Sequence, residues 1–223
     1  MSTLVLFDLD KTILIASPFN HHAFNESISS VYGIHADIRD VPHNGMTDEQ
    51  IIIATALHYG VPKRVVSRKL DSCKEYMVRY YKQRITPGDI SALVGVRELL
   101  DALKQRQFTL GLVTGNLEEV AFVKLEILGL DGFFTGGAFG SDDPDRANLI
   151  MLAQKRLGKH EQTIYVGDSK RDMQAAKRAN VVAFGVASGQ TTQDQLMRAG
   201  ADHAFSSLEN TDAILRVIAT FSR

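Results

Sequence analysis

Hydrophobic residues follow two different periods along this chain. Short, largely apolar runs, which are typical of strands buried on both faces, occur at 4–7, 108–113, 133–139, 163–166, 181–186 and 203–205. Between the later runs, apolar residues recur at helical spacing and predict helices around 96–103, 118–128, 146–157, 171–179 and 210–221. Helices that alternate with short buried strands form a parallel sheet covered by helices on both faces. The pattern therefore predicts an α/β, Rossmann-like fold.

A long helical stretch interrupts this alternation after the first strand. It contains no convincing strand, and its apolar spacing predicts helices at 18–32, 47–59 and 62–83. Thr47, with Gln50 three residues later, has the pattern of a capping box at the start of the second helix. We therefore divide the chain into an α/β core, residues 1–14 and 88–223, and an inserted all-helical cap, residues 15–87.

The balance of charge excludes several classes of partner. The chain holds 25 basic and 26 acidic residues, so it lacks the strong field that attracts nucleic acid or anionic membranes. Its longest apolar runs are far too short to span a bilayer. The first strand begins near Thr3, which leaves no room for a secretory signal ahead of it. We expect a cytoplasmic monomer or homodimer with no nucleic-acid or membrane partner.

Polar residues gather where the central strands of the predicted sheet end. Each of these strands is followed within a few residues by members of one set: Asp8, Asp10, Thr114, Gly115, Asn116, Asp168, Ser169 and Asp172. The carboxyl ends of parallel strands share one edge of a sheet, and ligands bind in the crevice beyond that edge. We therefore expect residues more than 100 positions apart to meet at one site.

The local pattern of these turns allows two interpretations. Thr114 or Asn116 can be explained as the N-cap of the helix at 118–128, and Asp168 or Ser169 as the N-cap of the helix at 171–179. Asp8 and Asp10, in contrast, stand so close that their carboxylates repel each other unless they share a cation. Mg²⁺ is a hard ion that takes oxygen ligands. Several acidic groups at separate strand ends favour a functional site over a set of helix caps.

Such a set contains the groups that phosphoryl transfer requires. One carboxylate can attack phosphorus, a neighbouring carboxyl can carry the proton, and a divalent ion neutralises charge on the phosphoryl oxygens. Thr114 and Asn116, together with backbone N–H groups at the following helix start, can donate hydrogen bonds to those oxygens. The motifs therefore favour an enzyme of phosphoryl transfer.

The spaced motifs resemble those of the haloacid dehalogenase-like (HAD) superfamily phosphatases. A D-x-D-x-T motif stands at 8–12, the second motif at 114–116 is Thr-Gly-Asn, and the last at 167–172 is Gly-Asp-Ser-Lys-Arg-Asp. The helical insertion resembles the C1 cap of the phosphoglycolate phosphatase-like branch. This resemblance covers essentially the whole chain.

The resemblance implies a role for each matching residue. Asp8 would be the nucleophile that forms an aspartyl-phosphate, and Asp10 would be the general acid and then the general base. Mg²⁺ would bind to Asp8, the backbone carbonyl of Asp10 and Asp168. Asp172 and Ser169 would not bind the ion themselves but would hold its ligands in place. The phosphate would be bound by Thr114, Gly115 and Asn116.

Three positions depart from the family pattern. Lys11 stands where a glycine usually follows the second aspartate, and Ile15 stands near the place of an aspartate that usually opens the cap. The third motif lacks its Lys-Pro pair, but Arg146 lies at the corresponding helix start and can hold a phosphate bidentately while balancing Asp8. The competing Lys155 falls nine residues deeper in the helix. We therefore assign phosphate binding to Arg146.

We expect a Mg²⁺-dependent phosphatase that hydrolyses a small phosphorylated metabolite. Arginines of the cap suggest an anionic ester of the phosphoglycolate kind: Arg39, Arg64, Arg68, Arg79 and Arg84. Two alternatives remain, a phosphomutase of the β-phosphoglucomutase kind and a non-catalytic regulatory member of the fold. Thr47 and Asp48 are candidates for substrate specificity, although a plain helix cap explains this segment equally well.

Overall fold

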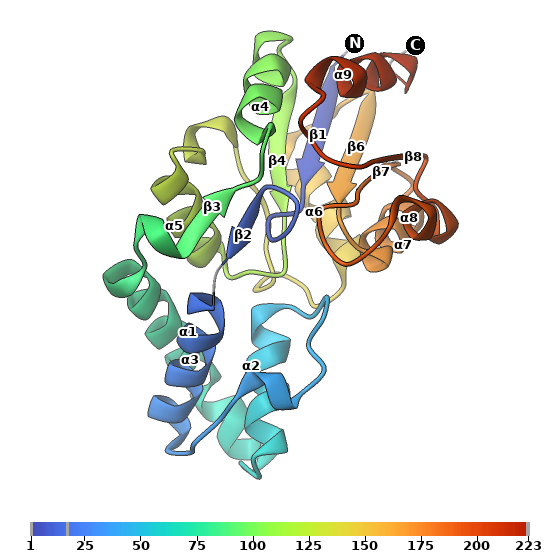
Figure 1. The fold of residues 1–223 in the computed structure, drawn as a ribbon. Coiled ribbons are helices and arrows are strands. Elements are labelled where there is room, and N and C mark those ends of the chain that lie inside the picture. The colour runs from blue at the N-terminus through green and yellow to red at the C-terminus, as the bar shows by residue number, and fades with distance from the viewer. Residues whose placement is uncertain (1, 17, 222–223) are drawn as a thin grey trace.

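The computed structural model describes residues 2–16 and 18–221 (Figure 1). One six-stranded sheet forms its centre, made of β1 (Thr3–Phe7), β4 (Thr109–Val113), β5 (Gly137–Ala138), β6 (Gln162–Gly167), β7 (Val182–Val186) and β8 (His203–Phe205). The order is β5-β4-β1-β6-β7-β8, and every neighbouring pair is parallel. The predicted parallel sheet is confirmed. Because β1 lies between β4 and β6, the ends of these three strands meet.

Helices cover both faces of this sheet. One face packs against α4 (Val96–Gln105), α5 (Glu118–Leu128) and α9 (Thr211–Phe221), and the other against α6 (Arg146–Leu157), α7 (Lys170–Arg178) and α8 (Gln193–Ala199). Successive side chains of a strand point to opposite faces. Along β1, Val5 and Phe7 therefore join the first core, and Leu4 and Leu6 join the second. Burial on both faces explains why this strand is a continuous apolar run.

The predicted insertion forms three helices that pack on one another, α1 (Phe19–Tyr32), α2 (Asp48–His58) and α3 (Lys63–Arg84). Figure 1 places them beyond the arrowheads of β1 and β6. Their core contains Phe24, Met77 and Tyr81, and it extends to Val120 at the start of α5. The predicted capping box of Thr47 at the start of α2 is confirmed. The division into core and cap at fixed residues stays a prediction.

Several short elements differ from the prediction. The two strands β2 (Leu14–Ala16) and β3 (Ile90–Ala92) pair antiparallel where the chain enters and leaves the insertion. We did not predict them, since three residues are too few to show a period. Helix α8, with seven residues, was missed for the same reason. The strand expected at 133–139 is reduced to the two residues of β5. Phe134 and Phe139 are buried although they lie in the loops on either side of β5, so the apolar run is longer than the strand.

The remaining described elements are the short 3-10 helices η1 (Ile38–Asp40), η2 (Pro87–Asp89) and η3 (Asp131–Phe133). None of the helices in residues 2–16 and 18–221 is both long enough and apolar enough to cross a membrane. α3 reaches 22 residues, but it carries charged side chains along its whole length.

Candidate active site

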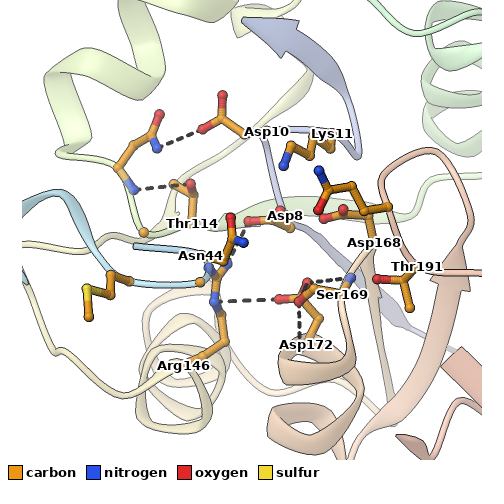
Figure 2. Close-up of a pocket in the computed structure, with 15 residues that line it drawn as sticks. Asp8, Asp10, Lys11, Asn44, Thr114, Arg146, Asp168, Ser169, Asp172 and Thr191 are labelled. Carbon is orange, nitrogen blue, oxygen red and sulfur yellow. Dashed lines mark hydrogen bonds and ion pairs between the residues drawn. The ribbon is translucent and has the colours of Figure 1, made fainter. Parts of the chain in front are cut away.

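One cavity of about 240 Å³ lies at the carboxyl edge of the sheet (Figure 2). The predicted residues that line it are Asp8, Asp10, Thr114, Gly115, Asn116, Arg146, Asp168, Ser169 and Asp172. They follow β1, β4 and β6 or stand in the first turns of α6 and α7. The convergence expected from the strand pattern is therefore present. Of the two cap candidates, Asp48 lines a neighbouring cavity.

Three buried carboxylates form the centre of the cavity. Asp8, Asp168 and Asp172 each offer an oxygen, and these oxygens lie within 4.8 Å of one another. Burial raises the pKa of Asp8 to about 8, against the opposing charge of Arg146. Burial, together with the charge of Asp172, raises the pKa of Asp168 to about 7. The ionised carboxylates therefore need a positive partner, and a hard cation such as Mg²⁺ fits this set of oxygen donors.

Arg146 lies beside the proposed nucleophile. Its Nη1 donates to Asp8 Oδ1 at 2.6 Å and to the carbonyl oxygen of Val113 at 3.2 Å, while its Nε lies 3.6 Å from Asp172 Oδ1. It is the first residue of α6, and the Asp145 side chain caps this helix. Lys155, on a later turn of α6, lines a different cavity. Arg146 thus lines the cavity of the acidic cluster, and Lys155 does not.

Asp172 holds the loop that carries Asp168. Its Oδ2 accepts hydrogen bonds from the backbone N–H and the hydroxyl of Ser169, at 3.0 and 2.5 Å, and Ser169 caps α7 in return. The Tyr165 hydroxyl donates to Asp172 Oδ1 at 2.9 Å. For Ser169 the capping interpretation is therefore correct, and the same capping box fixes two of the site residues. Gly189 packs directly against the Asp168 side chain. A Cβ at Gly189 would lie 2.1 Å from Asp168 Oδ2, so a residue with a side chain does not fit there.

The Asp10 side chain turns away from this acidic cluster toward α5. Asn116 Nδ2 donates to Asp10 Oδ2 at 2.8 Å. Lys124 Nζ donates to the two oxygens of Asp10 at 2.9 and 3.1 Å and to Asn116 Oδ1 at 2.7 Å. We did not predict Lys124. The available signal was its spacing from Val120, which puts a lysine on the buried face of a helix.

The first residue of α2 is docked on the second motif. Asp48 N–H donates to the carbonyl oxygen of Gly115 at 2.8 Å, and Asp48 Oδ2 accepts from the N–H of Leu117 at 2.9 Å. Leu117 is the N-cap of α5 and has no side-chain cap of its own. The alternative that Thr114 or Asn116 caps this helix is therefore wrong, since Asp48 from the insertion accepts the bond. Burial raises the pKa of Asp48 to about 7, against the charge of Lys124.

The turn after Asp10 keeps a conformation that suits glycine. Lys11 has a φ of +65°, in the left-handed region, which costs a residue with a side chain about 1 kcal/mol. Its N–H donates to the carbonyl oxygen of Leu14 at 2.6 Å, and its own carbonyl accepts from the Ser188 hydroxyl. Two hydrogen bonds therefore hold the turn, and the Lys11 side chain faces the cavity.

A second cavity of about 320 Å³ adjoins the first, and Asp10, Lys11 and Asn116 line both. The rest of its lining comes mainly from the insertion and includes Asn20, His21, Phe24, His43 and Asp48. The rings of His21 and His43 meet edge to face at 6.1 Å between centroids. A molecule held at the acidic cluster therefore has room to extend past Asp10 toward the insertion.

Comparison with known proteins identifies the family. Residues 5–186 match the family model described as haloacid dehalogenase-like hydrolase. The chain belongs to this family. It is 29% identical over 195 residues to a phosphoglycolate phosphatase of Agrobacterium fabrum, covering 86% of this chain and 83% of that protein. It is 31% identical over 209 residues to a phosphoglycolate phosphatase of Vibrio cholerae, with coverage of 89% and 90%.

The same fold occurs in the crystal structure of a β-phosphoglucomutase from Clostridium difficile, with a TM-score of 0.74 at 20% identity and complete coverage of both chains. At that identity the similarity concerns the fold. The prediction that this chain is a HAD-like phosphatase, a phosphoric monoester hydrolase, is confirmed.

Proposed function

We propose that this HAD-like protein hydrolyses a small phosphate monoester through an aspartyl-phosphate on Asp8, with Mg²⁺ as its cofactor. The observation that carries the proposal is the pairing of Asp8 with Arg146 at 2.6 Å inside a buried acidic cluster. Asp8 and Asp168 would hold the ion together with the backbone carbonyl of Asp10. When bound, Mg²⁺ neutralises negative charge on the phosphoryl oxygens.

The proposed reaction has two displacements at phosphorus. A carboxylate oxygen of Asp8 forms a bond to phosphorus while the bond from phosphorus to the ester oxygen breaks, and Asp10 gives that oxygen a proton. Water then attacks the phosphorus of the aspartyl-phosphate while Asp10 takes the water's proton. The bond from phosphorus to Asp8 breaks, which releases inorganic phosphate and restores the carboxylate.

The surrounding groups keep Asp8 reactive and hold the phosphoryl group. Burial disfavours the ionised form of Asp8, whereas the adjacent guanidinium of Arg146 favours it. Arg146 also faces the cavity with donors suited to phosphoryl oxygens. Thr114 and Asn116 line the same wall. Donors placed in advance around the phosphoryl group stabilise its charge without rearrangement.

For the substrate we propose a small anionic ester of the phosphoglycolate kind. The support is the two relatives named phosphoglycolate phosphatase and the second cavity, where Lys11, His21 and His43 suit a short polar leaving group. The test is phosphate release from a panel of metabolites that includes phosphoglycolate. Transfer of phosphate between positions of a glucose phosphate, without phosphate release, would identify a phosphomutase instead.

Chelation of Mg²⁺ is expected to end turnover and to lower stability by a pH-dependent amount. In the metal-free protein the pKa values of Asp8 (about 8) and Asp168 (about 7) lie above those of the unfolded chain. The fold therefore binds more protons than the unfolded chain and loses stability as pH rises from about 4 to 8. Across that window both carboxylates ionise and become ligands. The gain in Tm from Mg²⁺, measured by calorimetry, should be larger at pH 8 than at pH 6.

Two variants provide controls for this prediction. Asp168→Asn should remove most of the gain in Tm from Mg²⁺. Asp142→Asn alters an acidic residue that is paired with Arg156 outside the cavity, and it should leave the size and the pH dependence of that gain unchanged. Ca²⁺ should support little turnover, since its longer bonds and higher coordination number misplace the reacting oxygens. Full activity in chelator, or an equal gain in Tm at both pH values, would contradict the metal assignment.

Substitutions at the start of α2 are expected to affect phosphoglycolate more than acetyl phosphate. Thr47→Ala and Asp48→Ala alter the segment that docks on Gly115 and borders the second cavity. The value of kcat/KM for the preferred metabolite should fall about tenfold more than that for acetyl phosphate, because the acetyl group of acetyl phosphate is uncharged and offers the insertion fewer polar contacts than an anionic leaving group does.

The matched control is Thr192→Ala, which removes an equivalent capping box at the start of α8. Loss of either N-cap is expected to lower stability by about 1 kcal/mol, but Thr192→Ala should leave the ratio of the two kcat/KM values unchanged. Equal loss on both substrates from Thr47→Ala and Asp48→Ala would show that this segment stabilises the fold and selects no substrate.

A further inference from the structure

Lys124 is a buried lysine that the sequence motifs do not include. Its side chain is 1% exposed. The ammonium lies among groups from three separate elements: the Asp10 carboxylate after β1, the Asn116 amide after β4, and the ring of Tyr81 on α3, whose centroid is 5.8 Å from Nζ. A buried ammonium with such partners is fully engaged in a network, and its removal would leave the partners without a donor.

Stability alone does not explain this arrangement. Apolar residues of similar volume often replace a buried ion pair without loss of stability, and the rest of the buried face of α5 is mostly apolar, as with Val120, Ala121 and Leu125. The carboxylate that Lys124 holds is also not a buried one. The Asp10 side chain is 29% exposed and lines both cavities.

The three polar side chains form a closed triangle. Lys124 donates to both oxygens of Asp10 and to Asn116 Oδ1, and Asn116 Nδ2 donates to Asp10 Oδ2. Lys124 and Asn116 thus hold both oxygens of the Asp10 carboxylate and are hydrogen-bonded to each other. The carboxylate cannot rotate without breaking at least two hydrogen bonds. Asp10 is thereby kept at the junction of the cavities, where the ester oxygen of a substrate on Asp8 would lie.

We propose that Lys124 is a positioning residue, which with Asn116 orients the Asp10 carboxylate for proton transfer to the leaving group. This inference rests on the proposed function, in which Asp10 is the proton donor. Lys124 itself lines neither cavity, so it acts through Asp10. Proton-transfer catalysis depends on the distance and direction of the donor, and a freely rotating Asp10 would lose much of it.

The test compares two leaving groups in Lys124→Met, whose side chain has a similar length and no charge. An alkyl phosphate such as phosphoglycolate needs a proton on its leaving oxygen, whereas acetyl phosphate does not. We expect kcat/KM for phosphoglycolate to fall about 10- to 100-fold and that for acetyl phosphate to fall less than about threefold. In an Asp10→Asn background the same substitution should change kcat/KM for phosphoglycolate by less than about twofold, because its effect passes through Asp10.

Leu125→Met is the control for packing. It replaces the buried apolar residue next to Lys124 on α5 with one of similar volume and alters no residue that lines either cavity, so any loss should fall equally on both esters. Lys124→Gln, which keeps N–H donors but loses the charge, is measured in the same way if Lys124→Met does not fold. Failure of both variants to fold would assign Lys124 to stability and overturn the proposal.

The inference is overturned if Lys124→Met lowers kcat/KM equally for the two esters, or lowers it for neither. It is also overturned if Lys124→Met has its full effect in the Asp10→Asn background. In each of these cases the phosphatase function stands. A folded wild-type protein that releases phosphate from neither ester in Mg²⁺ overturns the proposed function and the inference together. The inference is supported if Lys124→Met lowers kcat/KM selectively for phosphoglycolate and this effect is absent in the Asp10→Asn background.

Discussion

Asp8→Asn is expected to reduce turnover by about 10⁴-fold or more, the scale of losing the nucleophile of a covalent mechanism. The amide is nearly isosteric with the carboxylate, but it cannot attack phosphorus. Asp8 is buried in a cluster with Asp168 and Asp172, so removal of one charge also relieves repulsion there. We therefore expect Asp8→Asn to stay folded, with a melting temperature close to that of the wild type.

The measurement is phosphate release from an aryl phosphate, together with mass spectrometry of acid-quenched enzyme. The wild type should show a phosphorylated peptide that contains Asp8, and the variant should not. Asp142→Asn is again the control for a carboxylate outside the cavity, and it should keep normal turnover. If Asp8→Asn retained more than about a hundredth of the wild-type rate, the nucleophile would be another residue.

Arg146→Ala is expected to lower kcat/KM about 10²- to 10³-fold, or about 2.7–4 kcal/mol, the scale of losing one preorganised charge partner in the transition state. Arg146 donates to Asp8 Oδ1 at 2.6 Å, and its Nε lies 3.6 Å from Asp172 Oδ1. Arg146→Lys should be intermediate, because lysine restores the charge but not the planar fork of donors.

Lys155→Ala is the control, since it removes a cation from the same helix at a position that lines another cavity. It should leave kcat/KM unchanged. Arg146→Ala also leaves Asp8 and Asp172 without a buried counter-ion, so its thermal stability is measured beside its rate. Arg146→Lys, which retains a cation, separates the loss of rate from the loss of stability. A low rate in Lys155→Ala with a normal rate in Arg146→Ala would place the third motif at Lys155.

The hydrophobic pattern alone determined the α/β class, because local spacing reports how each segment is buried. The run at 4–7 has apolar residues on both faces, and in the structure Val5 and Leu6 belong to opposite cores. Because parallel strands end at one edge of a sheet, the same pattern predicts that Asp8 and Asp168 share one site. The capping box of Thr47 was likewise predictable, since its hydrogen bonds are made within four residues.

The tertiary structure alone decided which groups face one another across elements. Asp48 caps α5 from a helix of the insertion, although Leu117 is 69 positions away, and Lys124 meets Asp10 over 114 positions. Such contacts depend on how the insertion and α5 pack, and local spacing carries no record of that packing. A lysine on an apolar helix face was visible in the sequence. Its partner was not, because a buried charge is matched by whichever carboxylate the fold brings within reach.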